Sequence, residues 1–169
     1  MLQIGDKAPD FILKGYFKTK VKDYSLKEFK GKWIVLFFYP ADFSYICPTE
    51  ITSLNTRIDS FRKINSVVLG VSADSMFSHQ KWAEELGGLD IVLLSDFHKR
   101  TSRDYNVLIE NTGMAFRGTF IIDPEGNIRY VMVADDNVGR STDEILRVLA
   151  ALQTGKMCPA DWETGDATL

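Results

Sequence analysis

Apolar residues along the chain occur in two kinds of run, short continuous ones and ones spaced by three or four positions. Residues 33–39 are apolar throughout and end at Pro40, as a strand buried on both faces would. The stretch after Pro48 has the spacing of one amphipathic helix, with apolar positions at Ile51, Leu54, Ile58 and Phe61. The sequence therefore predicts a buried strand, a short loop and a helix over residues 33–61.

The same two patterns alternate through the middle of the chain. Residues 66–71 and 91–94 are rich in β-branched and aliphatic side chains and predict two more strands. Residues 75–86 predict a helix closed by Gly87-Gly88, and a short polar helix is expected to end near Arg103.

The C-terminal third predicts a hairpin followed by a helix. Residues 117–123 and 127–134 are strand-like, and the segment between them, Asp123-Pro124-Glu125-Gly126-Asn127, has the composition of a tight turn. From about Thr142 a last helix has one apolar face. Together these elements predict an α/β fold with a mixed central β-sheet flanked by helices. Residues 127–134 are a candidate edge strand that could pair with a second copy.

Composition narrows the class of protein. A chain of 169 residues fits one domain, since domains usually run about 100 to 200 residues. Lys+Arg 20 against Asp+Glu 23 gives a net charge of −3, so no basic excess is available to bind nucleic acid. The N-terminal residues show no signal-peptide pattern, and no apolar run is long enough for a membrane span. We therefore expect a cytoplasmic protein without a membrane partner.

The chain has two cysteines, Cys47 and Cys158, and each precedes a proline. Two are too few for a disulfide scaffold. They also lack metal-ligand spacing with His79 and His98, so we expect no metal site and interpret both histidines as exposed. The cysteines are then either buried bystanders or one functional pair.

Cys47 lies at the predicted start of a helix, directly before Pro48. Proline suits the first helical turn, and the free N–H groups there favour an anion, here the nucleophilic thiolate. Ser44 can turn its hydroxyl toward the sulfur, Pro40 can screen the site from water, and Arg117 can supply a positive charge from an otherwise apolar strand. The alternative is that Cys47 is a small buried hydrophobe.

These residues resemble a known family. Pro40-x-x-x-Ser44-x-x-Cys47 is similar to the Pro-x-x-x-Thr/Ser-x-x-Cys motif of the peroxiredoxins. The segments Arg117-Gly118-Thr119-Phe120, Val138-Gly139-Arg140-Ser141 and Met157-Cys158-Pro159-Ala160-Asp161-Trp162 resemble further blocks of the typical two-cysteine branch. Within that branch, the likeness is greatest to the peroxidase component of bacterial alkyl hydroperoxide reductase and the thiol-specific antioxidant proteins, and it covers nearly the whole chain.

The resemblance implies a thioredoxin-like fold and a thiol-dependent peroxidase that needs no cofactor. Cys47 would attack hydrogen peroxide or an organic hydroperoxide and become a sulfenic acid, with Arg117 and Ser44 supporting it. Arg140 would pair with Glu50, although a plain salt bridge is the stronger interpretation for Arg140 than for Arg117. Cys158 would resolve the sulfenic acid of the partner subunit by forming a disulfide.

The resemblance also sets expectations for organisation and partners. Residues 1–154 would form the peroxidase domain and residues 155–169 a tail that carries the resolving cysteine. The electron donor would be thioredoxin or a dedicated flavoprotein disulfide reductase, and the working unit a homodimer or a ring of five dimers. Gly87-Gly88-Leu89-Asp90 only partly matches the Gly-Gly-Leu-Gly loop of peroxide-sensitive members, and their C-terminal Tyr-Phe helix has no counterpart. We therefore expect Cys47 to resist overoxidation.

Two other functions remain open at this point. One is a chaperone-like or signalling assembly in which large rings matter more than turnover. The other is a thioredoxin-like disulfide oxidoreductase, which requires a Cys-x-x-Cys pair that Cys47-Pro48-Thr49-Glu50 lacks.

Overall fold

A mixed seven-stranded sheet runs through the centre of the protein, in the strand order β2-β1-β5-β4-β3-β8-β9. The description rests on a computed structural model of residues 1–169. The strands of this sheet are β1 Ile12–Phe17, β2 Lys20–Ser25, β3 Trp33–Phe38, β4 Ser66–Ser72, β5 Val92–Ser95, β8 Arg117–Ile122 and β9 Ile128–Ala134. Neighbours β3, β4 and β5 are parallel, whereas β8 and β9 continue the sheet antiparallel. The short strands β6 Leu108–Ile109 and β7 Met114–Ala115 pair with each other.

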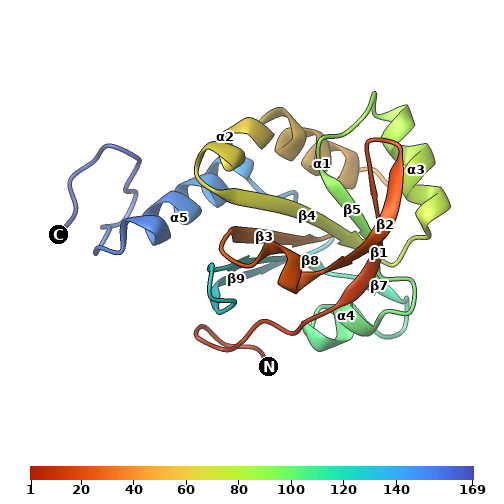
Figure 1. The fold of residues 1–169 in the computed structure, drawn as a ribbon, viewed down its shortest axis with the longest axis horizontal. Coiled ribbons are helices and arrows are strands. Elements are labelled where there is room, and N and C mark those ends of the chain that lie inside the picture. The colour runs from red at the N-terminus through yellow and green to blue at the C-terminus, as the bar shows by residue number, and fades with distance from the viewer.

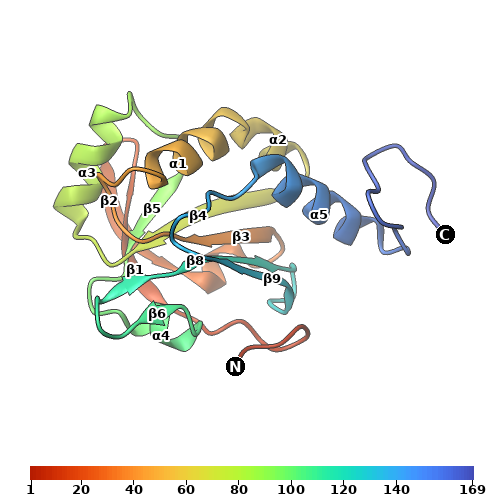
Figure 2. The same cartoon turned by 180° about the vertical axis from the view of Figure 1, so that it is seen from behind.

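Five α-helices flank the sheet: α1 Cys47–Thr56, α2 Ile58–Lys63, α3 Met76–Glu85, α4 Arg100–Asp104 and α5 Thr142–Thr154, with a 3₁₀ turn at Leu26–Phe29. Helices α1, α2 and α5 lie on one side of the sheet, and α4 lies on the other with β6 and β7 (Figures 1 and 2). The expected α/β architecture with a mixed sheet is confirmed.

The central strand β3 separates two apolar cores. Val35 and Phe37 pack with the helices α1, α2 and α5, and the alternate residues Ile34, Leu36 and Phe38 pack on the opposite face. Successive side chains of a strand point to opposite faces, so a strand between two cores must be apolar at every position. This explains the continuous apolar run from which the strand was predicted.

The single helix predicted after Pro48 is interrupted at Arg57, which separates α1 from α2. The hydroxyls of Thr52 and Thr56 each donate to the carbonyl one turn earlier, at 2.6 Å to Pro48 O and 2.9 Å to Thr52 O. Such bonds compete with the helical ladder and bend helices. All four predicted apolar positions nevertheless pack into the same core.

The hairpin of β8 and β9 follows the prediction, and β9 lies at an edge of the sheet, as expected. The N-terminal hairpin of β1 and β2 was not predicted. Its turn residues Lys18 and Thr19 have φ of 45° and 71°, a left-handed conformation that usually depends on Asn or Gly, so the customary sequence signal is absent.

Helix α5 ends at Gly155, which has φ of 66° and so closes the helix in the left-handed conformation. Residues 155–169 form no helix or strand and project beyond the sheet (Figure 1). The division into a domain at 1–154 and a tail at 155–169 stays a prediction. None of the helices has the length and apolar character needed to cross a membrane.

Candidate active site

Cys47 is the first residue of α1, and Pro48 follows it within the first helical turn. The loop that precedes it leaves the end of β3, so a buried strand holds one end of the loop and the helix holds the other. The carbonyl of Ile46 accepts the N–H groups of Thr49 and Glu50, at 3.0 and 3.2 Å. The Cys47 side chain is fully buried. The local structure predicted from Pro48 is therefore present.

Arg117, the first residue of β8, places its guanidinium against the Cys47 sulfur. Its Nη1 donates to Cys47 Sγ at 3.4 Å, and its Nε donates to the carbonyl of Asp136 at 3.0 Å. The arginine is only 4% exposed. A guanidinium held in this way stabilises negative charge on the sulfur, which is what a nucleophilic thiolate requires.

Glu50 joins two arginines beneath the sulfur. Arg117 Nη1 donates to Glu50 Oε1, and Arg140 donates to Glu50 Oε2 from its Nε at 2.6 Å and from its backbone N at 3.0 Å. All three side chains are buried. With Cys47 as thiolate, the two negative and two positive groups of this cluster balance.

Burial tends to lower the pKa of both arginines, but the net shift is downward for Arg140 and upward for Arg117. Burial lowers the pKa of Arg140, and the hydrogen bond and charge of Glu50 offset only part of this. Burial also works against Arg117, yet the hydrogen bonds and charges of Cys47 and Glu50 outweigh it and raise its pKa. The guanidinium beside the sulfur is thus the better stabilised cation of the two.

Arg140 stays away from the sulfur, because its hydrogen bonds go to Glu50, to the carbonyl of Gly118 at 2.9 Å and to Thr119 Oγ1 at 3.2 Å. Its guanidinium lies 3.3 Å from the centre of the Phe37 ring. The geometry of Arg140 fits a positioning ion pair, whereas Arg117 contacts the reactive atom.

Ser44 and Pro40 both lie in the loop before α1. Pro40 is buried, and the Ser44 hydroxyl donates to the carbonyl of Ala41 at 2.8 Å rather than to the Cys47 sulfur. The hydroxyl therefore braces the loop and forms no hydrogen bond with Cys47.

Cys158 lies apart from this cluster, in the segment after α5. Its sulfur is within 3.5 Å of Thr154 Oγ1 and 3.8 Å of the carbonyl of Ala151. It lines a small pocket with the end of α5 and the basic side chains Arg129, Arg147 and Lys156. Both cysteines are free thiols.

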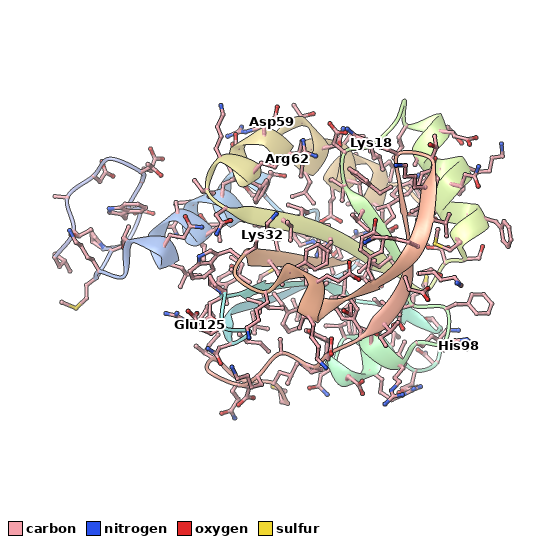
Figure 3. All side chains as sticks on the ribbon, in the orientation of Figure 1. Lys18, Lys32, Asp59, Arg62, His98 and Glu125 are labelled. Carbon is pink, nitrogen blue, oxygen red and sulfur yellow. The ribbon has the colours of Figure 1, made fainter.

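The interpretation of His79 as an exposed residue was wrong. His79 is fully buried, with Nδ1 at 2.7 Å from Asp42 Oδ2 and Nε2 at 3.0 Å from the carbonyl of Leu94. Because that carbonyl can only accept, Nε2 carries a proton, and a second proton must lie between Nδ1 and the carboxylate. His98, in contrast, is exposed at the surface, as expected (Figure 3).

The pair formed by His79 and Asp42 anchors the loop before α1 to helix α3. Asp42, which belongs to the loop, also accepts from Tyr39 at 2.7 Å and from Ser78 at 2.9 Å. Burial and the charge of Asp42 raise the pKa of Tyr39, so the tyrosine stays a donor. The signal that could have found His79 is helical spacing, since Trp82 and Ala83 lie three and four positions later on the same buried face.

Replacing His79 with leucine is expected to lower the free energy of unfolding by about 3 kcal/mol, because the buried Asp42 carboxylate loses its principal partner. Urea denaturation at matched protomer concentration measures the change. The control is His98→Leu, which removes an exposed imidazole and is expected to change stability by less than about 0.5 kcal/mol. Equal losses in the two variants would contradict the role given to the Asp42 pair.

No group of three or more His, Cys, Asp or Glu side chains is arranged to hold a metal ion. The most distinctive chemical feature of the structure is the buried thiol of Cys47, with the guanidinium of Arg117 on its sulfur.

Known proteins resemble this chain over nearly its whole length. Residues 4–131 match the model of the AhpC/TSA family. Peroxiredoxin prdx-2 of Caenorhabditis elegans is 46% identical over 98% of this chain and 88% of its own length. Peroxiredoxin 2 of Drosophila melanogaster is 44% identical over 100% of this chain and 92% of its own.

Solved structures agree in fold. The reduced 2-Cys peroxiredoxin of Plasmodium vivax superposes with a TM-score of 0.93 at 36% identity, covering 98% of this chain and 91% of that one. AhpC of Enterococcus faecalis gives a TM-score of 0.89 at 36% identity, covering 94% and 100%. These likenesses confirm the thioredoxin-like fold. A sequence this similar throughout, folded around a buried thiol with an arginine on its sulfur, belongs to the AhpC/TSA family, and the chain is a peroxiredoxin, a thiol-dependent peroxidase.

Proposed function

We propose that Cys47 is the peroxidatic cysteine and reduces hydrogen peroxide and small organic hydroperoxides without a cofactor. The contact of Arg117 Nη1 with Cys47 Sγ carries this proposal. The thiolate attacks the distal oxygen of the hydroperoxide, so that an S–O bond forms and the O–O bond breaks. The sulfur ends as a sulfenic acid, and the leaving oxygen takes the proton that the thiol gave up.

Arg117 has a second role in this step. Once a peroxide lies beside the sulfur, the guanidinium can donate to its oxygens and stabilise the charge that moves onto the leaving oxygen. Glu50 and Arg140 hold the guanidinium in place, Ser44 offers a hydroxyl to the bound peroxide, and the buried Pro40 helps to exclude water.

We further propose that Cys158 of the partner subunit resolves the sulfenic acid. Its thiolate attacks the Cys47 sulfur, the S–OH bond breaks and a disulfide forms, while the departing hydroxide takes the proton that the Cys158 thiol gave up and leaves as water. The Plasmodium vivax relative of known structure is a 2-Cys peroxiredoxin. Because Cys47 is fully buried, the first turn of α1 has to open before two sulfurs can meet, which costs the two hydrogen bonds to the carbonyl of Ile46.

The disulfide must then be reduced by two electrons from outside the chain. A thioredoxin or a dedicated flavoprotein disulfide reductase is the proposed donor. The cytoplasmic location and the resistance of Cys47 to overoxidation stay predictions.

Two surfaces support the proposed assembly. The exposed edge of β9 suits pairing with a second copy in a homodimer. A cleft of about 890 Å³ is bordered by the exposed apolar side chains of Ile12, Phe77 and Phe97, and such a patch suits a second contact that would link dimers into a ring of five. Phe77 lies on α3 next to Ser78 and His79, which hydrogen-bond to Asp42 in the loop before α1. A contact at Phe77 would therefore affect the position of that loop.

The mechanism predicts a disulfide-linked dimer after peroxide treatment, visible by non-reducing gel electrophoresis. Wild-type protein is expected to give the dimer band, while Cys47→Ser and Cys158→Ser each give none. Cys47→Ser should also abolish peroxide consumption, and any chaperone-like activity of the assembly should survive in it. A disulfide formed within one chain, or a dimer band in either single variant, would overturn the proposed partner-subunit disulfide.

A further inference from the structure

The loop of residues 135–139, between β9 and Arg140, lies over the active site. The carbonyl of Asp136 accepts the hydrogen bond from Arg117 Nε at 3.0 Å. Farther along, a Cβ added at Gly139 would lie 3.2 Å from Ile46 Cγ2, so the loop also touches the residue before Cys47. Residues 135–139 are all exposed, whereas Cys47 and Arg117 beneath them are buried. This exposed loop therefore contacts both Arg117 and the residue before Cys47, and together with residues 41–49 we call it the rim of the site.

The charges of this rim are of one sign. Asp135 and Asp136 are adjacent and exposed, and neither forms an ion pair. The other segment around Cys47, residues 41–49, contains no lysine or arginine, and its one acid, Asp42, is buried against His79. The buried cluster below offers no compensating charge, because Arg117 and Arg140 are balanced by Glu50 and the Cys47 thiolate.

We infer that Asp135 and Asp136 make the enzyme discriminate against hydroperoxides that carry a negative charge, in favour of neutral ones. The inference rests on the proposed role of Cys47 and adds its substrate class. An anionic group attached to a bound hydroperoxide has to lie outside the buried pocket, hence near the rim. By Coulomb's law in water, two negative charges at a separation of about 8 Å would slow an anionic substrate by about five-fold at low salt. The effect falls as ionic strength rises, because counter-ions screen exposed charges.

The test compares two hydroperoxides that share the same reacting group: cumene hydroperoxide and its derivative with a carboxylate in the para position. Rate constants for Cys47 oxidation are measured in a Cys158→Ser background, by rapid quenching and mass spectrometry of the trapped sulfenic acid. The readout is the ratio of the anionic to the neutral rate constant. A general disturbance of Arg117 slows both substrates and cancels in this ratio.

The double variant Asp135→Asn/Asp136→Asn is expected to raise the ratio by about five-fold at low salt and by much less at about 0.5 M salt. The matched control, Asp59→Asn/Glu125→Gln, removes the same net charge elsewhere. Asp59 lies on α2, beyond the far end of α1 from Cys47, and Glu125 lies in the turn at the far end of β8 from Arg117 (Figure 3). The control is expected to leave the ratio unchanged.

Two results would overturn the inference: a ratio that does not change in the rim variant, or one that rises equally in the control. Failure of the proposed function is distinguishable from both, because then the Cys158→Ser protein would form no Cys47 sulfenic acid even with the neutral hydroperoxide.

Discussion

Replacing Arg117 with methionine is expected to lower the rate constant of Cys47 oxidation by peroxide by about 10² to 10³-fold. Methionine keeps the apolar stem of the side chain but has no donor and no charge. The sulfur then loses the hydrogen bond that it accepts from Nη1 at 3.4 Å, and the leaving oxygen loses its only nearby cationic donor, since Arg140 is committed to Glu50, Gly118 and Thr119. Stopped-flow measurement of peroxide consumption gives the rate constant.

The control for this prediction is Arg103→Met. Arg103 forms a comparable two-point ion pair with Glu110, at 2.9 and 3.0 Å, but on the exposed surface. Its loss is expected to leave the rate within about two-fold of wild type. Arg117→Lys restores the charge without the second donor and should recover part of the rate. If the Arg117→Met enzyme reacted as fast as wild type, the guanidinium would have no role in peroxide reduction.

The sequence could predict those parts of the fold whose conformation is determined by the residues of the segment itself. Strand β3 is apolar on both faces because it lies between two cores, and the turn of the β8–β9 hairpin contains Pro124 and Gly126 where the chain reverses. The β1–β2 turn, built from Lys18 and Thr19, depends on neighbouring pairing rather than on turn-forming residues, and it was missed for that reason.

The same distinction applies to the site. Two local signals were sufficient here. Pro48 after Cys47 predicted the start of α1, and a lone arginine in an apolar strand predicted the cation beside the sulfur. The pairing of Asp42 with His79 joins a loop to a helix that lies much farther along the chain, and the pattern of either segment alone gives no sign of it. The partnership of Glu50 with Arg140 was expected only through the resemblance to peroxiredoxins, because its two members lie on α1 and before α5.

Glu50→Gln is expected to lower the free energy of unfolding by about 3 to 5 kcal/mol. Glutamine fills the same space but carries no charge, so Arg117 and Arg140 stay buried, close together and without their common counter-ion. Denaturant titration at matched protomer concentration measures the loss. The control is Glu84→Gln, which breaks an exposed ion pair with Lys81 at 3.0 Å and should cost at most about 1 kcal/mol.

A third variant separates the charge of Glu50 from its packing. Arg140→Met removes one of the two cations and leaves Glu50 paired with Arg117. With Cys47 protonated, the charges of these two residues cancel in this variant. Its loss of stability is therefore expected to be smaller than that of Glu50→Gln, although Arg140 is the larger side chain and packs on Phe37. The reverse order would mean that packing, and not the shared counter-ion, holds this site together, and that Arg117 does not depend on Glu50 for its position beside Cys47.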